Sequence, residues 1–185
     1  SDFVFKTAID HVEFIAEFAD DIKDIVPVLP AVTKEWELIK EYRKKQGNRV
    51  LWYVCCWPDF PNTFIKSPLC ESRLIPILSF FMPVDGFLRW NYTVWPDNPR
   101  EKISYRFPNW KAGDTNFVYP SNNGAPLLTL RYKLLKRGIE DYELLKMVEN
   151  KHGYDCEPIK KVQNLLLKKD IESYNIESKE SEYIS

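Results

Sequence analysis

The order of strand-like and helix-like segments constrains the fold of this 185-residue chain more than any other feature. Strands that alternate with helices of about ten to fifteen residues are typical of parallel βαβ units. The chain therefore predicts an α/β protein in which each of about four parallel strands is followed by a helix. We expect strands at 3–9, 23–30, 48–58 and 85–95, and helices at 11–22, 33–47, 67–82 and 127–151.

Individual residues indicate where the helices begin and end. Thr33 is a suitable N-cap for the helix at 33–47, and Gly47 is a suitable stop. Ser67 followed by Pro68 is typical of a helix start, because proline is favoured at the first helical position. Pro76 then predicts a kink or a break within the same segment, since proline lacks the amide that an internal turn needs.

The number of strands limits the size of the fold. A closed (β/α)8 barrel needs eight such units and about 250 residues. This chain has half of that, so it is either the second half of a barrel or a small α/β domain that stands alone. The expected organisation is a TIM-like half-barrel domain at 1–155, an additional helix at 156–172 and a polar tail at 173–185.

Composition and short motifs exclude several classes of protein. The net charge of −1 gives no basic surface for nucleic acid or an anionic membrane, and no apolar run reaches the eighteen residues of a membrane span. The four cysteines and two histidines match neither a disulfide framework nor a zinc site. There is no phosphate-binding glycine loop and no nucleophile elbow. We therefore expect no metal and no cofactor.

Two further features are ambiguous. The first residues contain neither a signal peptide nor an initiator methionine. The cellular location is therefore not predicted, and the choice between a fragment and a complete product stays open. The adjacent Cys55 and Cys56 fall in the predicted strand at 48–58. Neighbouring strand residues point to opposite faces, so both are interpreted as small apolar fillers.

Three stretches resemble one known family. They are VLWYVCCWPDFPNTFIKSPLCESRLIP, DGFLRWNYTVW and WKAGDTNFVYPSNNGAPLLTLRYKLLKRGIEDYELL, which together lie within residues 48–150. These stretches resemble the C-terminal part of domain-of-unknown-function family 4091, which is similar to the catalytic domain of glycoside hydrolase family 123. The motifs are specific only in combination.

The resemblance implies both a fold and a reaction. It implies a (β/α)8 barrel of which this chain supplies strands five to eight. It also implies hydrolysis of glycosides of an N-acetylated amino sugar, in which the acetamido oxygen of the substrate attacks the anomeric carbon, an exception to the usual pair of protein carboxylates. In the family an adjacent Asp-Glu pair follows the fourth strand. No Asp-Glu dipeptide occurs here, so we expect no catalytic residue in the chain and no activity from the chain alone.

The adjacent Glu140 and Asp141 do not replace that pair. They are in the reverse order and fall in a predicted helix, where successive side chains diverge by about 100°. Lys136 with Glu140, and Arg137 with Asp141, have the spacing of ion pairs on a helix surface. We interpret both carboxylates as scaffold.

Ligand contacts in such a barrel come from the carboxyl ends of the strands and from the loops that follow them. Tryptophan and tyrosine faces suit the C–H faces of sugars, and Asp and Asn suit their hydroxyls. A carbohydrate is therefore the expected partner. The candidate substrate-binding residues are Trp52, Tyr53, Trp57, Asn62, Trp90, Asn91, Trp95, Trp110, Asp114 and Tyr119.

The roles of two groups of candidate residues, and of one further residue, have open alternatives. Trp52 and Tyr53 point to opposite faces of a strand, so one of them belongs to the site and the other to the core. Asp114 either binds a hydroxyl or forms a turn after Gly113. Arg89 lies in an apolar strand, where it needs either a buried ion pair or a ligand.

Two classes of function remain. The first is a carbohydrate-active barrel, most like a hydrolase of hexosaminides, for which this chain supplies substrate-binding walls. The alternative is a non-catalytic glycan-binding or structural domain. In either case the half-barrel needs a partner surface, which is the missing N-terminal half or a second copy of the chain.

Overall fold

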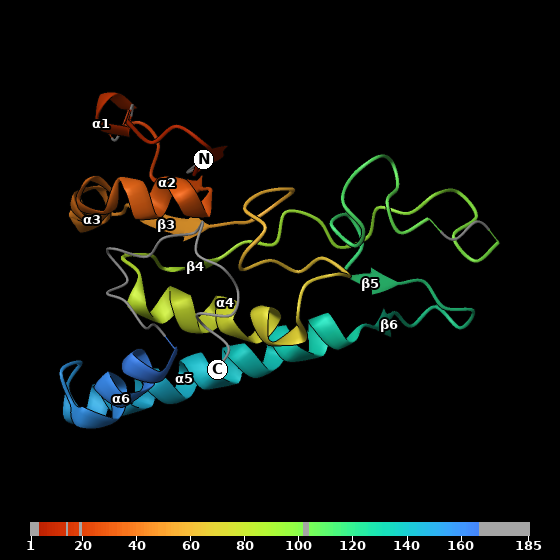
Figure 1. The fold of residues 1–185 in the computed structure, drawn as a ribbon. Coiled ribbons are helices and arrows are strands. Elements are labelled where there is room, and N and C mark those ends of the chain that lie inside the picture. Colours follow the sequence, from red (N-terminus) through yellow and green to blue (C-terminus); the bar gives the residue numbers. More distant parts are fainter. Residues whose placement is uncertain (1–3, 14, 19, 102–103, 167–185) are drawn as a thin grey trace.

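The computed structural model describes residues 4–13, 15–18, 20–101 and 104–166 (Figure 1). Four parallel strands form one sheet in the order β1 (Lys6–Ile9), β2 (Asp24–Pro27), β3 (Arg49–Trp52) and β4 (Gly86–Phe87). Each strand pairs with the one that precedes it in the chain, as in an α/β barrel, whereas a doubly wound sheet reverses its order. The predicted alternation of parallel strands and helices is confirmed.

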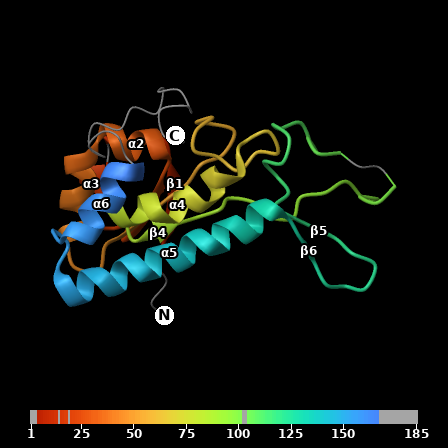
Figure 2. The ribbon, with the colours of Figure 1, turned by 60° about the horizontal axis from the view of Figure 1, so that its bottom comes forward.

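Helices connect and cover these strands. In Figure 1, α2 and α3 lie beside β3, and α4, α5 and α6 lie beyond β4. The turned view of Figure 2 shows α5 running along the length of the molecule beside α4. The helices are α1 (Ile15–Phe18), α2 (Leu29–Lys34), α3 (Trp36–Lys44), α4 (Leu69–Phe81), α5 (Leu130–His152) and α6 (Glu157–Leu166).

Several predicted boundaries were wrong. The strand expected at 23–30 ends at Pro27, because the next residues already form α2 with Pro30 in its first turn, where proline is tolerated. Thr33 lies inside α2 rather than at the start of α3, whose N-cap is Glu35. Pro68, and not Ser67, is the N-cap of α4.

Pro76 does not break α4, and the reason lies on α5. The two helices make the most extensive contact in the fold, and Gly138 of α5 faces Arg73 and Pro76 of α4. A Cβ atom at position 138 would lie 2.2 Å from the carbonyl oxygen of Arg73 and 2.8 Å from Cδ of Pro76. Only glycine permits this approach of the two backbones, so the Pro76 ring packs against α5 at the one position of this contact that has no side chain.

The core lies between the sheet and the helices. Ile25, Val50 and Leu78 are completely buried, and β2 is buried along its whole length. Trp52 belongs to the same core, where its indole N–H donates a hydrogen bond to Oγ of Ser79 on α4 at 2.7 Å. This buried donor is satisfied by a helix residue, so Trp52 packs on the helix-covered side of β3.

The amino ends of the strands are held by charges. The buried carboxylate of Asp24 at the start of β2 pairs with Lys6 of β1 at 3.3 Å and with Arg49 of β3 at 2.5 Å. Three neighbouring strands are thereby joined at one edge. Residues at this edge of a barrel generally serve stability rather than function.

The opposite edge of the sheet leads into long loops. After β4 the chain forms an extended segment that ends in the antiparallel hairpin of β5 (Val118–Tyr119) and β6 (Leu127–Leu128). Figures 1 and 2 both show this segment and the hairpin extending away from the sheet and helices. The strand predicted at 85–95 is therefore only two residues long, and its remainder belongs to the loop.

Two sequence predictions concern the ends of the chain and its surroundings. The additional helix predicted at 156–172 corresponds to α6, whose described part ends at Leu166, and the tail at 173–185 lies outside the described residues. Among the described helices, none has the length and apolar character needed to cross a membrane.

Candidate functional site

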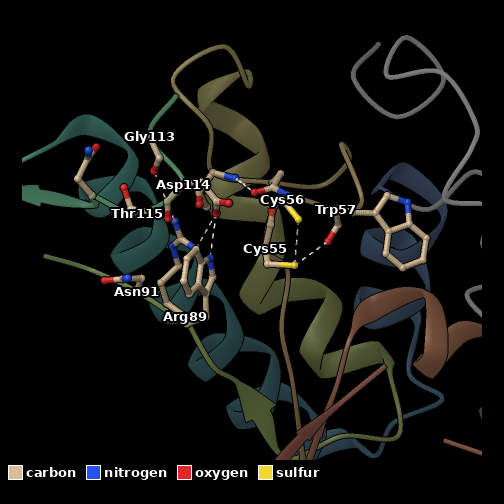
Figure 3. A network of polar contacts seen from close by, with 12 residues as sticks. Cys55, Cys56, Trp57, Arg89, Asn91, Gly113, Asp114 and Thr115 are labelled. Atoms are coloured by element: carbon tan, nitrogen blue, oxygen red, sulfur yellow. Dashed lines mark hydrogen bonds and ion pairs between the residues drawn. The ribbon is translucent and has the colours of Figure 1, made fainter. Parts of the chain in front are cut away.

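A buried pair of opposite charges lies where β4 ends. Nη1 of Arg89 is 3.6 Å from Oδ1 of Asp114, and neither side chain has exposed surface. Nη2 of Arg89 also donates hydrogen bonds to the backbone oxygens of Asp114 and Gly113. Figure 3 shows the pair with its neighbours. Of the two alternatives for Arg89, the structure has the buried ion pair.

This pair is poorly satisfied by hydrogen bonds. Nε and Nη1 of Arg89 and Oδ2 of Asp114 are buried without a hydrogen-bond partner. Burial lowers the pKa of Arg89 to about 10 even though the Asp114 carboxylate opposes this change. Burial also raises the pKa of Asp114, against the hydrogen bond from Trp90 and the charge of Arg89. Perturbed groups of this kind cluster at functional sites.

Asp114 holds an aromatic surface in place. Nε1 of Trp90 donates a hydrogen bond to Oδ1 of Asp114 at 2.9 Å. The Trp90 ring meets Trp110 edge to face, with centroids 5.9 Å apart and an interplanar angle of 70°. Trp110 keeps 41% of its surface exposed. We call Arg89, Trp90, Trp110 and Asp114 the strand-end site.

Two more strands bring polar groups to the same edge. Tyr53 directly follows β3 and is half-buried, and Asp10 directly follows β1. Burial raises the pKa of Tyr53, and the nearby Cys55 and Asp10 raise it further. Asp10 was not predicted as a site residue, because it stands in a short link without any motif. Its position after a parallel strand was the signal that could have identified it.

Cys55 and Cys56 do not point to opposite faces as predicted. The strand ends at Trp52, and in the bend that follows the two Sγ atoms lie 3.8 Å apart. The Cys55 thiol also donates to the carbonyl oxygen of Trp57 at 3.6 Å. Burial raises the pKa of the Cys55 thiol. The pair therefore lies in the loop beside Asp114 rather than filling the sheet (Figure 3).

Asn62 organises the loop after β3. It is completely buried, and its Nδ2 donates to the carbonyl oxygens of Pro58 at 2.6 Å and Cys55 at 2.9 Å. Its backbone N–H donates to Oε2 of Glu71 at 2.6 Å. Because both its donor groups are engaged and covered, Asn62 supports the loop and presents no surface to a ligand.

Arg131 in the first turn of α5 joins three loop segments. Its guanidinium donates to the carbonyl oxygens of Thr63, of Gly113 and of Asn116, the last two at 2.8 Å each. Burial lowers its pKa. Sequence reasoning did not identify this residue as important. No local pattern distinguishes it from Lys133 in the same turn, because its partners come from segments far away in the chain.

A separate cavity lies between the loop and the hairpin. Its volume is about 410 Å³, and its walls include Trp95, Tyr105, Tyr119 and three prolines, with Asn116 and Arg100 as polar members. We call this cavity the hairpin pocket. It shares no lining residue with the strand-end site.

The ten predicted contact residues fall into distinct groups. Trp52, Asn62 and Asp114 are completely buried and expose no surface to a ligand. Trp90 and Trp110 come together in the strand-end site, and Trp95 and Tyr119 line the hairpin pocket. Tyr53 remains half-exposed at the strand edge. The indole of Trp57 and the amide of Asn91 point away from the buried pair in Figure 3.

Glu140 and Asp141 on α5 form ion pairs, as expected for scaffold residues, but their partners are not the predicted ones. Asp141 accepts two hydrogen bonds from Arg73 of α4, at 2.6 and 2.9 Å, rather than pairing with Arg137. Arg137 pairs instead with Glu140 at 2.7 Å. Tertiary packing brought Arg73 within reach of Asp141, which spacing along one helix could not indicate.

A larger groove of about 750 Å³ lies between α4, α5 and α6. Its lining is mostly apolar, and its polar members Glu71, Arg73 and Asp141 already bind protein groups. Such a surface offers few hydrogen-bonding groups to a sugar. Among the described residues, no group of three or more His, Cys, Asp or Glu side chains could hold a metal ion.

Comparisons with known proteins agree with this geometry. The sequence model of the glycoside hydrolase 123 catalytic domain matches residues 1–148. A solved family 123 glycoside hydrolase from Clostridium perfringens, described in work on glycolipid glycan hydrolysis, superposes with a TM-score of 0.72 at 25% identity. The match covers 94% of this chain but only 29% of that one. No curated protein sequence matches. The chain belongs to the glycoside hydrolase 123 catalytic-domain family.

Proposed function

We propose that this chain is the C-terminal half of a (β/α)8 barrel that hydrolyses glycosides of N-acetylated amino sugars, and that it supplies part of the substrate-binding wall. The observation that carries this proposal is the family match over residues 1–148. The sheet order supports it, because four consecutive parallel strands are half of a barrel.

The strand-end site has the surface that a sugar requires. The Trp90 and Trp110 rings present apolar faces at the carboxyl edge of the sheet, and the hydrogen bond to Asp114 fixes Trp90. Sugar C–H faces pack on such rings, and rigid aromatic groups bind with little loss of side-chain freedom. Tyr53 and Asp10 add hydrogen-bonding groups at the same edge.

The reaction itself needs groups that this chain does not provide. In the proposed substrate-assisted retaining mechanism, one carboxylate orients the acetamido group and a neighbouring acid protonates the leaving oxygen. The sequence has no Asp-Glu pair, and Asp114 is enclosed by Arg89 and Trp90. We infer that polypeptide outside these 185 residues contributes the acid pair, while this chain binds and orients the sugar.

The first test combines binding with hydrolysis. We expect the isolated chain to bind N-acetylhexosamine, measured by saturation-transfer NMR, but not to cleave a 4-methylumbelliferyl N-acetylhexosaminide. Trp110→Ala should weaken binding about tenfold, which corresponds to about 1.4 kcal/mol. The matched control is Tyr154→Ala, because Tyr154 is 40% exposed, close to the 41% of Trp110, but lies next to the α5–α6 turn.

Two outcomes would contradict the proposal. Hydrolysis by the isolated chain would mean that its own residues suffice for catalysis. Equal binding by the Trp110 variant and the Tyr154 control would mean that the strand-end site is not a sugar surface.

A non-catalytic glycan-binding or structural domain is the second candidate function. The absence of an Asp-Glu pair from the sequence and the enclosure of Asp114 favour it. The discriminating observation is the gene sequence upstream of this region. An adjacent Asp-Glu at the end of a buried strand there supports catalysis, and a gene without one supports binding or a structural role.

The half-barrel also requires a partner surface. Within the described sheet, β1 and β4 each have a neighbour on one side only. Unpaired strand edges bind further strands readily, so we propose that the other half of the barrel covers them. Sedimentation of the isolated chain tests this, because a stable dimer would indicate self-association instead.

A further inference from the structure

We propose that the hairpin pocket is a second sugar subsite, which binds the ring next to the one held at the strand-end site. The inference rests on the proposed function for the class of ligand. The hairpin pocket has a volume of about 410 Å³, which lies within the range of about 300 to 1,000 Å³ that is usual for small-molecule sites.

The aromatic walls of the pocket are held in position before any ligand arrives. Nε1 of Trp95 donates to the carbonyl oxygen of Val118 in β5 at 3.1 Å. The Tyr119 hydroxyl donates to Oδ1 of Asn116 at 3.0 Å. Tyr105 completes the aromatic lining and is 49% exposed. Preorganised aromatic faces of this kind favour a flat, partly apolar ring such as a sugar.

An unused hydrogen-bond donor identifies the polar requirement of the ligand. Asn116 lines the pocket and is only 1% exposed, yet its Nδ2 has no hydrogen-bond partner. Its other side-chain atom already accepts from Tyr119, and its backbone oxygen accepts from Arg131. A buried amide without a partner is costly, so a ligand oxygen at this position would restore the missing bond.

The two sites lie within the reach of one oligosaccharide. Asp114 supports the strand-end site and Asn116 lines the hairpin pocket, and two residues of chain span at most about 7 Å. An antiparallel bridge joins Thr93, which lies between Trp90 and Trp95 in the chain, to Asn116 of the segment that also carries Asp114. A single glycan can therefore occupy both sites with adjacent rings, and the pocket then selects substrates that extend beyond one sugar.

Calorimetry with N-acetylhexosamine and with its β-linked disaccharide tests this subsite. We expect the disaccharide to bind the unmodified chain at least about tenfold more tightly than the monosaccharide. Tyr105→Ala should remove most of this advantage and leave the affinity for the monosaccharide unchanged. Asn116→Asp should do the same, because it exchanges the free donor for an acceptor and keeps the oxygen that binds Tyr119.

Trp110→Ala serves as the comparison variant and should lower the affinity for both the monosaccharide and the disaccharide. Unchanged disaccharide affinity in the folded Tyr105→Ala variant would overturn the subsite while leaving the proposed function intact. Failure of the unmodified chain to bind either sugar would contradict the proposed function and the subsite together. Circular dichroism of each variant shows whether it is folded, and Tyr105→Ala keeps the test decisive if Asn116→Asp does not fold.

Discussion

Two arginine–aspartate pairs join distant segments of this protein, and they differ in almost every physical respect. Arg73 on α4 and Asp141 on α5 form a two-point contact at 2.6 and 2.9 Å, with 54% and 24% of their side chains exposed. Arg89 and Asp114 are 3.6 Å apart, completely buried, and have polar atoms without partners. The well-formed pair is in the helix layer, and the poorly satisfied pair is at the strand ends.

The difference separates scaffold from site. A solvated pair contributes little to stability, so it can be placed wherever it assists packing. A buried pair loses hydration that its attraction only partly restores. Its presence at the carboxyl edge of the sheet is explained by what it supports, because Asp114 fixes the indole of Trp90. Adjacent carboxylates are therefore a weaker sign of a site than one buried, incompletely bonded carboxylate.

The largest expected effect comes from separating the buried pair. Arg89→Met should lower the free energy of unfolding by about 3–5 kcal/mol, because it leaves the Asp114 carboxylate buried without its cation. Urea denaturation of the purified variant measures this change. The double variant Arg89→Met, Asp114→Asn should regain a large part of the loss. A single variant as stable as the unmodified chain would show that the pair is not charged.

The second effect concerns the contact between α4 and α5. Gly138→Ala should destabilise the fold by about 1–3 kcal/mol, since its methyl group would overlap the Arg73 carbonyl oxygen. Thermal unfolding measures the loss. Gly153→Ala is the comparison at a glycine with free space around it, although its positive φ of 82° adds strain of its own. Sugar binding should be unchanged in folded Gly138→Ala, and a loss of binding would contradict the separation of scaffold from site.

A smaller effect is expected from the exposed pair. Asp141→Asn should cost at most about 1 kcal/mol, because Arg73 remains solvated when its partner loses charge. Measured beside Arg89→Met in the same urea series, it compares the two pairs directly. A loss equal to that of Arg89→Met would remove the distinction between them. The salt dependence provides a further check, since the exposed pair should weaken as ionic strength rises.

The smallest effect is a dependence on pH. Burial raises the pKa of folded Asp114 above its ordinary value of 3.8, so the folded state binds its proton more tightly than the unfolded state. Its favourable contribution is therefore fully present below pH 3.8 and is lost as pH rises through the folded value. Relative to Asp114→Asn, the unmodified chain should be most stable in acid. A stability of the unmodified chain that increases relative to Asp114→Asn as pH rises would contradict this prediction.

Parts of the site could be predicted from sequence and parts could not. Trp90 and Trp110 were predicted as site residues because aromatic residues after a buried strand suit a sugar, and the structure brings their rings together. Asp114 was predicted as well, but its contact with Trp90 was not, because a hydrogen bond from an indole 24 residues earlier leaves no local pattern. Arg131 was missed for the same reason, since it binds carbonyl oxygens of segments up to 68 residues away.

The sequence by itself determined the α/β class of the fold and the likeness to the glycoside hydrolase 123 catalytic domain, whereas the narrower label of family 4091 stays a prediction. The alternation of apolar strands with amphipathic helices depends on local periodicity, which each segment carries independently of the others. The reversed order of Glu140 and Asp141 and the absence of an Asp-Glu pair were equally readable. Tertiary structure alone decided which arginine meets which aspartate, which aromatic rings keep a surface and where the hairpin pocket lies. Those properties arise from distances between segments far apart in the chain, and no local pattern encodes such distances.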